Sequence, residues 1–548
     1  MAALKVATSR PGQDTAVPGD GALPPLPRWT WPLCWAVLTV ALGLLVRLPG
    51  PAVLDPDEHA SVLYFDRLVA GERLEEPLLS APKPLLTVVH GLAWRAGHDW
   101  RLLEAVTVAV FALAVVCLAR AAGRLGGLPA AAATVLAVAG SGPLVLQAAR
   151  GNSIVFALAG WSVALDALTR DASPPGQDPA RSGVAWGTAA AALAVAGLAR
   201  AETWPLLPLA AAWGLVAWWR GRRPPPPGPA GRPGLDPTRA GLGRGQGRPL
   251  LLVLPLAVPL LWLAHDWLLT GDPLFAFRVP GRYTDLVAGR QVIPPGDWLA
   301  LVARRYRPDL LLLALAVVGI VWLVRRRAWV WLAGLGVTGI GVLALLGLEA
   351  WRGTYVSWRY FDPADLAVRL AAALGAAALA TALTGHLAGR WRTGRLAAAG
   401  AGVAAVLLVA VASWPLAPVD PEVDATLDRG ARLSANTATA IGVLRPLAAR
   451  PGTVLTVSGP QRVRVAVELD LPLGRVRDLF LATLSAPLDQ ALAGSDAVFH
   501  DADGDRPARR FARLSTTTPA RVGEVRLVPL RTDPGRGLYV QRVEESRG

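Results

Sequence analysis

The sequence predicts a mainly α, polytopic membrane protein, with about eleven transmembrane helices followed by a small C-terminal α/β domain. Hydrophobic residues make up 53% of the 548 positions, and the mean hydropathy is +0.40. Several apolar runs approach the roughly 20 residues that a helix needs to cross a bilayer. Each run is expected to be helical, because lipid offers no hydrogen-bond partner to an exposed backbone.

The expected spans form one transmembrane domain over residues 30–415. They are the apolar runs at 30–48, 101–119, 129–147, 151–168, 184–199, 203–219, 249–268, 309–324, 329–348, 365–386 and 396–415. Residues 1–29 are polar and rich in Pro and Gly, which predicts a disordered cytoplasmic N-terminus. The run at 30–48 is interpreted as a first span and not as a cleaved signal peptide.

Arginines predict the orientation of the spans, because cytoplasmic loops of membrane proteins are rich in basic residues. With the N-terminus in the cytoplasm, the cytoplasmic connections include 120–128, 325–328 and 387–395, each with arginines. The 220–248 loop carries seven arginines and one acid, and its composition predicts a disordered cytoplasmic linker. The outer segments 269–308 and 349–364 also carry arginines. Either the orientation is wrong there, or these arginines meet an anion on the outer side, a donor phosphate or a lipid headgroup.

The C-terminal residues 416–548 are expected to form an extracytoplasmic α/β domain that carries no catalytic motif. Strand-like runs and helix-like patterns alternate there, which is typical of this class. The expected strands lie at 453–457, 496–500, 525–530 and 538–543, and the expected helices lie near 434–450, 484–493 and 506–514.

Charge and cysteine content exclude other classes of protein. The net charge of +15 is explained by cytoplasmic loops, so no nucleic-acid partner is expected. Cys34 and Cys117 lie in apolar runs and form neither a disulfide framework nor a metal motif. Only Lys5 and Lys83 are lysines among 55 basic residues, in a composition typical of GC-rich genomes such as those of actinobacteria. A retained lysine such as Lys83 is therefore informative, and the expected location is a bacterial plasma membrane.

An acidic group opens the first outer loop, 49–100, where the first span ends. Asp55, Asp57 and Glu58 lie there, and acids at a membrane boundary face a wet cavity or a cation. Such a carboxylate can act as a general base or hold a divalent metal ion, with His59 as a candidate second ligand beside Asp57. Solvation, or the N-terminus of the following helix, is the alternative explanation, and the sequence does not decide which aspartate is the base.

Two amphipathic helices are expected in the same loop, lying in the plane of the membrane interface. The first contains Leu63, Tyr64, Leu68 and Val69 opposite Asp66, Arg67, Glu72 and Arg73, and the second spans 84–97.

The order of these features resembles the GT-C superfamily of polytopic membrane glycosyltransferases. Asp57-Glu58 follows the first span, Pro82-Lys83-Pro84-Leu85 closes the loop, and Arg101 opens the next span. The likeness is greatest to the protein mannosyltransferase and aminoarabinose transferase branch, and it extends over residues 30–415. Further segments that resemble the family are ARGNSIVFALAGWSVALDAL at 149–168, GLARAETWPLLPLA at 197–210, LTGDPLFAF at 269–277 and SWRYFDPADL at 357–366.

The resemblance implies transfer of a sugar from a polyprenyl-phosphate donor to a cell-envelope glycan, lipid or protein on the outer face. Asp57 would be the general base, with Glu58 in support and Asp55 as a rival base. Lys83, Arg359 and Tyr360 would hold the donor phosphate. The other residues expected at the pocket are Arg200, Glu202, Arg282 and Arg352.

The sequence departs from the family pattern at three places, and two other functions stay open. Leu85 replaces the second proline of the lysine motif, Asn152 replaces a frequent acid, and Arg200-Ala201-Glu202 lacks a proline. A transporter or flippase of lipid-linked precursors would need charged residues within spans and an internal repeat. An inactive membrane scaffold would use its outer domain to bind a partner.

Overall fold

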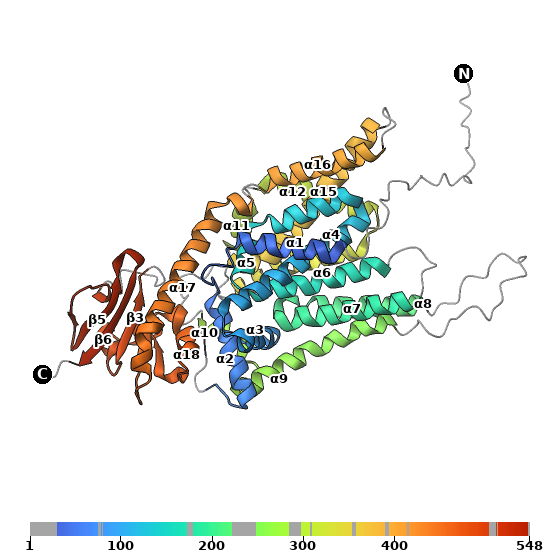
Figure 1. Ribbon diagram of the computed structural model, residues 1–548. Helices are drawn as coiled ribbons and strands as arrows, with labels where there is room; N and C mark the ends of the chain where they lie inside the picture. The colour runs from blue at the N-terminus through green and yellow to red at the C-terminus, as the bar shows by residue number, and fades with distance from the viewer. Residues whose placement is uncertain are drawn as a thin grey trace, which may run out of the picture.

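The protein is a bundle of helices with a small β-sheet at one end (Figure 1). The computed structural model describes residues 30–74, 78, 80–171, 179–221, 248–283, 297–306, 309–352, 358–388, 394–413, 416–502, 511 and 513–545. The bundle helices are α1 (Thr30–Leu45), α4 (Trp100–Ala139), α5 (Gly142–Ala149), α6 (Ser153–Asp171), α7 (Pro179–Ala199), α8 (Leu206–Gly221), η3 (Arg248–Ala257), α9 (Val258–Thr270), α12 (Leu310–Arg325), α13 (Trp329–Gly336), η7 (Val337–Gly341), α14 (Val342–Trp351), α15 (Asp362–Ala388) and α16 (Gly394–Ala412). Shorter helices are η1 (Ala201–Thr203), α10 (Phe275–Tyr283), α11 (Trp298–Tyr306), η8 (Trp358–Phe361) and η9 (Ala417–Val419).

Helices cover most of each expected apolar run within the described residues, and the longest of these helices can cross a membrane. Within the described residues, five helical stretches combine sufficient length and hydropathy: Trp100–Ala139, Ser153–Arg170, Leu250–Thr270, Trp329–Trp351 and Asp362–Leu383. Shorter apolar helices lie at Thr30–Leu45, Val184–Ala199, Leu310–Arg325 and Ala399–Ala412. The fold is therefore that of an integral membrane protein with several spans, and the number eleven stays a prediction.

Helix α4 is two helices joined by a break, and this corrects the expected connection at 120–128. Forty residues of α-helix would be about 60 Å long, twice the hydrocarbon thickness. Gly126 and Gly127 have non-helical dihedrals, and a Cβ on Gly123 would lie 3.4 Å from that of Ala131. The chain therefore turns back at two glycines, and the residues before them stay helical.

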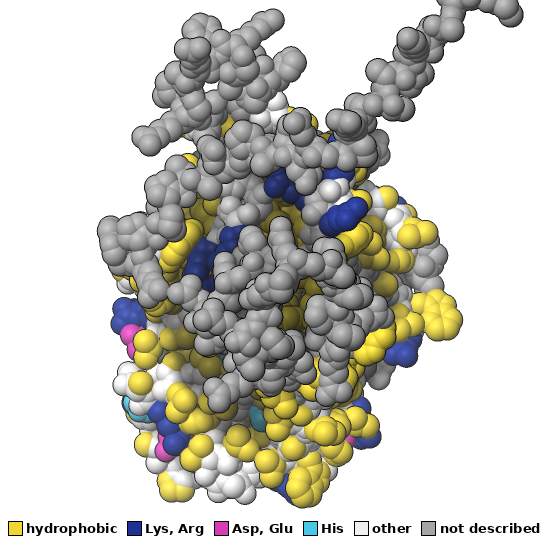
Figure 2. All heavy atoms as spheres, turned by 90° about the vertical axis from the view of Figure 1, so that its right-hand side faces the viewer, with side chains coloured by type: hydrophobic (Ala, Val, Ile, Leu, Met, Phe, Trp, Pro, Cys, Tyr) yellow, Lys and Arg dark blue, Asp and Glu magenta, His cyan; other side chains and the backbone are white. Residues whose placement is uncertain are grey.

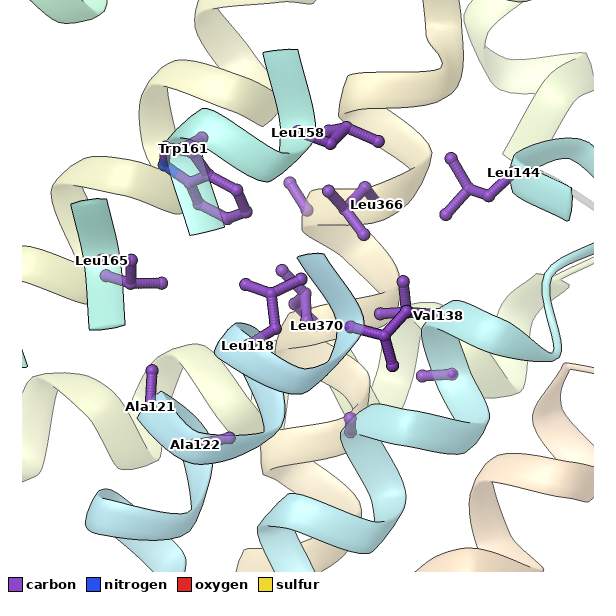
Figure 3. Close-up of a cluster of buried hydrophobic side chains, with 14 of the residues drawn as sticks. Leu118, Ala121, Ala122, Val138, Leu144, Leu158, Trp161, Leu165, Leu366 and Leu370 are labelled. Carbon is purple, nitrogen blue, oxygen red and sulfur yellow. The ribbon is translucent and has the colours of Figure 1, made fainter. Parts of the chain in front are cut away.

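Close helix packing forms the core of the bundle. Figure 3 shows side chains of α4, α6 and α15, among them Leu118, Leu158 and Leu370, gathered between their helices. Helices α12 and α15 approach even more closely, because a Cβ on Gly319 would collide with the carbonyl oxygen of Ala371. Small residues at such contacts are a common packing device between membrane helices.

The outside of the bundle is largely apolar. Exposed large hydrophobic side chains lie along α1, α9, α12 and α16, as expected for helices that face lipid. Figure 2 looks onto the end away from the sheet, where Lys and Arg side chains lie among hydrophobic ones.

Asp166 is buried between α4 and α6 and is surrounded by cations, with Arg124 Nη1 at 2.7 Å and Arg120 Nη2 at 3.8 Å.

The segment 49–100, expected to be the first outer loop, contains two helices, α2 (Pro56–Ala70) and α3 (Pro84–Gly97), which confirms the helix expected at 84–97. Helix α2 starts at Pro56, whose missing N–H costs nothing in a first turn, and ends at Gly71 with φ +69°. The expected apolar face is also present. However, its residues Leu63 and Tyr64 pack on the C-terminal region, so protein covers this part of the face, whereas Val69 is exposed.

The C-terminal region contains helix α17 (Pro421–Ala448) and a six-stranded sheet of order β2-β1-β3-β6-β5-β4. The strands are β1 (Leu455–Val457), β2 (Val476–Asp478), β3 (Ala497–Asp501), β4 (Ala520–Val522), β5 (Val525–Asp533) and β6 (Leu538–Glu545). Three short helices accompany them: α18 (Arg462–Glu468), α19 (Leu479–Ser485) and α20 (Leu488–Leu492). β1 pairs in parallel with β2 and β3, whereas β6 lies antiparallel to β3 and β5.

The sequence predicted four of these strands and missed β2 and β4. Helix α17 begins at Pro421 and not at 434, and most of the expected helix 506–514 lies outside the described residues. One end of α17 contacts α5 and the other end contacts β3 and β6, so it connects the bundle with the sheet. The boundary expected at residue 416 stays a prediction.

Candidate active site

Two residues predicted separately, Glu58 and Lys83, form a buried ion pair. Glu58 lies in the first turn of α2, and its side chain is fully buried. Lys83 precedes the first turn of α3, and its Nζ lies 3.3 Å from Glu58 Oε1. The other carboxylate oxygen, Oε2, lies 3.5 Å from Nδ1 of His90 on α3. The packing of α2 on α3 therefore places an acid, a cation and an imidazole together.

Burial dominates the electrostatics of this group. Burial raises the pKa of Glu58 from its ordinary 4.5 to about 7; Lys83 opposes this rise, while Asp57 and Asp55 add to it. Burial also lowers the pKa of His90 to about 3, and the Lys83 charge acts in the same direction. At neutral pH the imidazole is therefore uncharged, and Glu58 is close to its point of half protonation.

The two aspartates lie at the more accessible edge of the same group. Asp55 is the N-cap residue of α2, and its backbone N–H donates to the carbonyl of Arg150 at 3.0 Å. This bond ties the start of α2 to the turn between α5 and α6. Asp55 and Asp57 are half-buried, in contrast to Glu58. A carboxylate that must meet a substrate needs such access, so the geometry suits either aspartate as a base and leaves the choice between them open.

A second ion pair lies beside the first. Arg200 is buried, and its Nη2 lies 2.6 Å from Glu202 Oε1. Its Nη1 donates to Asn152 Oδ1 at 3.4 Å, and its guanidinium lies 5.6 Å from the centroid of the Tyr360 ring. Burial alone would raise the pKa of Glu202, but Arg200 outweighs it and lowers the pKa, and the charge of Lys83 helps.

The remaining predicted residues are not brought into this group by the described contacts. Arg352 is exposed, and its Nη1 lies 3.7 Å from Glu349 Oε1. The side chains of Arg282 and Arg359 lie outside the described residues. Their roles stay predictions.

Sequence reasoning missed His90, which lies against Glu58, and the buried Thr87 on the same helix. Thr87 and His90 follow Lys83 by four and seven residues on the helix expected at 84–97, a spacing that places all three on one face. Asn152 had been noted only as a departure from a pattern, yet it contacts Arg200.

The structure does not favour the metal site expected at Asp57 and His59. These residues are two apart on α2, and residues at that spacing do not face each other on a helix. The buried His59 ring packs edge-on against Trp100, with centroids 4.6 Å apart. Across the described ranges, no group of three or more His, Cys, Asp or Glu residues could hold a metal ion.

No family model and no curated protein matches the sequence, but solved structures do. ArnT from Cupriavidus metallidurans bound to undecaprenyl phosphate matches with a TM-score of 0.52 and 13% identity, over 94% of this chain and 98% of that one. The apo form gives 0.49 and 14%, over 93% and 98%. An Archaeoglobus fulgidus oligosaccharyltransferase, tethered with an acceptor peptide containing the NVT sequon, gives 0.48 and 12%, over 87% and 69%.

At these identities the match to undecaprenyl-phosphate-bound ArnT shows a shared fold. The resemblance drawn from the sequence is therefore confirmed at the level of the fold.

Proposed function

We propose that this protein is a membrane glycosyltransferase that uses a polyprenyl-phosphate-linked sugar as its donor. The observation that carries the proposal is the Lys83–Glu58 pair next to Asp57 in sequence, with the Arg200–Glu202 pair linked to it by the turn at Gly151 and Asn152. A Cβ on Gly151 would lie 3.6 Å from Glu58 Cγ, and Asn152 Oδ1 accepts from Arg200 Nη1 at 3.4 Å. This arrangement lies in a chain with the fold of ArnT, whose structure contains undecaprenyl phosphate. Two cations held at one place suit a lipid phosphate, and a half-buried aspartate beside them suits an acceptor hydroxyl.

The proposed reaction is a displacement at the anomeric carbon of the donor sugar. Asp57 takes the proton from the acceptor hydroxyl, and the acceptor oxygen forms a bond to the anomeric carbon. The bond from that carbon to the phosphate oxygen breaks, and the polyprenyl phosphate leaves with both electrons. Lys83 and Arg200 stabilise the charge on the phosphate, in the manner of other preorganised cations. Asp55 is the alternative base.

The carboxylates that pair with these cations tune the phosphate site. A donor phosphate that binds Lys83 competes with the Glu58 carboxylate for this cation. The two negative groups, phosphate and carboxylate, also repel each other. Because burial already raises the pKa of Glu58 to about 7, a nearby phosphate favours its protonation. The neutral carboxyl group still accepts from the lysine ammonium but no longer offsets the lysine charge that the phosphate meets. Tyr360, which lies against Arg200, Arg359, Arg282 and Arg352 are further candidates for phosphate contacts.

The finer parts of the proposal concern the sugar, the acceptor and the orientation. The donor sugar is a hexose or a pentose, and the acceptor is a glycan, lipid or protein of the cell envelope. The N-terminus lies in the cytoplasm of a bacterial plasma membrane, and the active site and the C-terminal region lie outside. Exposed arginines in an expected cytoplasmic connection, such as Arg325, Arg326 and Arg327, support this orientation.

Transfer from a panel of radiolabelled polyprenyl-phosphate sugars to envelope acceptors tests the proposal with the purified protein. We expect Asp57→Asn to lower kcat roughly 10²- to 10⁴-fold, because general base catalysis is lost. Lys83→Ala is expected to raise the KM for the donor. Asp66→Asn is the matched control, since Asp66 lies on the same helix, is also half-buried, and pairs with Arg95 at 3.1 Å.

Three outcomes would contradict parts of the proposal. Undiminished transfer by Asp57→Asn removes Asp57 as the base, and a loss confined to Asp55→Asn then assigns the role to Asp55. An unchanged donor KM in Lys83→Ala removes the lysine from the phosphate site. Absence of transfer by the wild type with every donor overturns the glycosyltransferase assignment.

A further inference from the structure

A polar stripe on α3 faces the buried carboxylate of Glu58. Lys83, Thr87 and His90 follow one another at helical spacing, and the side chains of Thr87 and His90 are fully buried. The stripe begins with the cation that pairs with Glu58 and ends with the imidazole 3.5 Å from the other carboxylate oxygen. Glu58 therefore lies against the stripe, between its two ends.

Four buried polar atoms in this group lack a hydrogen-bond partner among the described residues: Glu58 Oε2, Thr87 Oγ1 and both ring nitrogens of His90. Buried polar atoms in folded proteins are nearly always satisfied. The pair that can satisfy itself most directly is His90 Nδ1 and Glu58 Oε2. Their separation of 3.5 Å exceeds an ordinary N–H···O bond by a few tenths of an ångström. A small rotation of the ring closes this gap.

The surroundings of His90 favour a neutral ring that donates. A neutral imidazole has one N–H donor and one acceptor nitrogen, and Glu58 offers an acceptor while the Lys83 ammonium disfavours a second positive charge. The charged or titratable groups near the carboxylate and the ring are Asp55, Asp57, Lys83 and His59. Among these groups, a neutral His90 ring whose Nδ1–H donates to the Glu58 carboxylate adds no second positive charge beside Lys83.

Packing also restricts where the ring can go. The His90 ring lies edge-on to Phe156 of α6, with centroids 5.9 Å apart. The next residue, Gly91, lies so close to Phe65 of α2 that a Cβ there would overlap the Phe65 ring. Helices α2 and α3 are thus held together beside His90, and the ring stays directed at Glu58.

We propose that His90 is a positioning residue whose Nδ1–H donates to Oε2 of Glu58 and thereby holds Oε1 against Lys83. The lysine ammonium is then presented at a fixed place to the phosphate of the donor. This role rests on the proposed function, because it acts on donor binding and not on the reacting atoms.

Two substitutions of similar size separate hydrogen bonding from packing. His90→Asn keeps an N–H donor near the position of Nδ1, and His90→Leu removes it. We expect His90→Leu to lower kcat/KM roughly 10- to 100-fold, mainly through the KM for the donor, as Lys83 loses its fixed position. His90→Asn is expected to recover most of this loss. His98→Asn is the matched control, because His98 is exposed just beyond the end of α3.

A double-mutant cycle with Glu58→Gln then shows whether His90 acts through Glu58. In the Glu58→Gln background we expect His90→Leu to cause little further loss, because residues in one network are not additive. Full additivity would overturn the proposal, and so would equal losses in His90→Asn and His90→Leu or a donor KM unchanged in His90→Leu. If His90→Leu fails to fold, donor binding by His90→Asn is compared with donor binding by the wild type. An affinity close to that of the wild type agrees with the proposal, and a large loss of affinity overturns it. Wild type that transfers no sugar contradicts the proposed function instead.

Discussion

At the scale of single residues, burial and charge oppose each other most strongly at Glu58. The carboxylate is fully buried, and the Lys83 ammonium lies 3.3 Å from it. Burial of an ionised carboxylate is costly even when it is paired, so the folded protein binds a proton at Glu58 more tightly than the unfolded chain does. This property gives a prediction about stability that does not depend on the substrate.

Glu58→Gln is expected to flatten the pH dependence of stability. The folded-state pKa of about 7 lies above the ordinary 4.5, so wild type gains stability from this group below about pH 4.5 and loses it as pH rises through about 7. The loss is on the order of 3 kcal/mol. The glutamine variant has no such proton, so its melting temperature relative to wild type should rise between pH 5 and pH 8. Thermal unfolding in detergent measures this.

Glu72→Gln is the matched control for that experiment. Glu72 is exposed just after α2 and forms an ion pair with Arg67. Its substitution should leave the pH dependence unchanged. Parallel pH curves for wild type and Glu58→Gln would show that Glu58 is not buried in the folded protein as described.

Sequence reasoning identified Glu58 and Lys83 because each residue type is unusual at its position in this chain. An acid at the end of an apolar span and one of two lysines in a chain of arginines both stand out. His90 does not stand out, because its role depends on the packing of α3 against α2. That contact relies on the fit between Gly91 and Phe65, which residue spacing along one helix does not report.

At the scale of elements, packing between helices also decides where a helix ends, and the sequence does not report that packing. The arginines Arg120 and Arg124 predicted a connection at 120–128, but both are helical. Arg124 lies 2.7 Å from the buried Asp166, so it is held within the bundle. The break is confined to Gly126 and Gly127. β2 and β4 were missed for a similar reason, since strands of three residues are too short to show an alternating pattern.

Gly127→Ala is expected to destabilise the hairpin within α4. Gly127 has φ +68° and ψ −159°, a region essentially restricted to glycine, and a side chain there costs about 1–3 kcal/mol. The space around it is open, with the nearest atom, Pro129 Cδ, at 3.7 Å, so backbone strain is the only penalty. The melting temperature of the purified protein should fall.

Gly336→Ala is the control for backbone strain. Gly336 ends helix α13 with nothing within 4 Å of an added Cβ, and alanine is the better helix former by about 1 kcal/mol. Its melting temperature should stay unchanged or rise. A Gly127→Ala protein as stable as wild type would mean that the chain does not turn back at this glycine.

At the scale of the whole molecule, the C-terminal region packs on the helix that carries the candidate acids. Ala60, Leu63 and Tyr64 of α2 belong to the same buried cluster as Leu444 of α17 and Val465 of α18. Glu468 at the end of α18 accepts a hydrogen bond from Trp100 Nε1 at 2.7 Å. The sequence predicted a region of strands and helices without a catalytic motif, and it contained no signal that this region would cover α2.

This packing implies that the C-terminal region controls the position of the acids, and two glycines of α17 provide the test. A Cβ on Gly430 would overlap the side chain of Val53, two residues before Asp55, whereas a Cβ on Gly442 would meet nothing within 4 Å. Both positions are helical, so alanine favours the helix equally at each. We expect Gly430→Ala to lower kcat/KM roughly tenfold or more by displacing the start of α2, and Gly442→Ala to leave it unchanged. Equal activity of the two variants would mean that α17 does not position the acids.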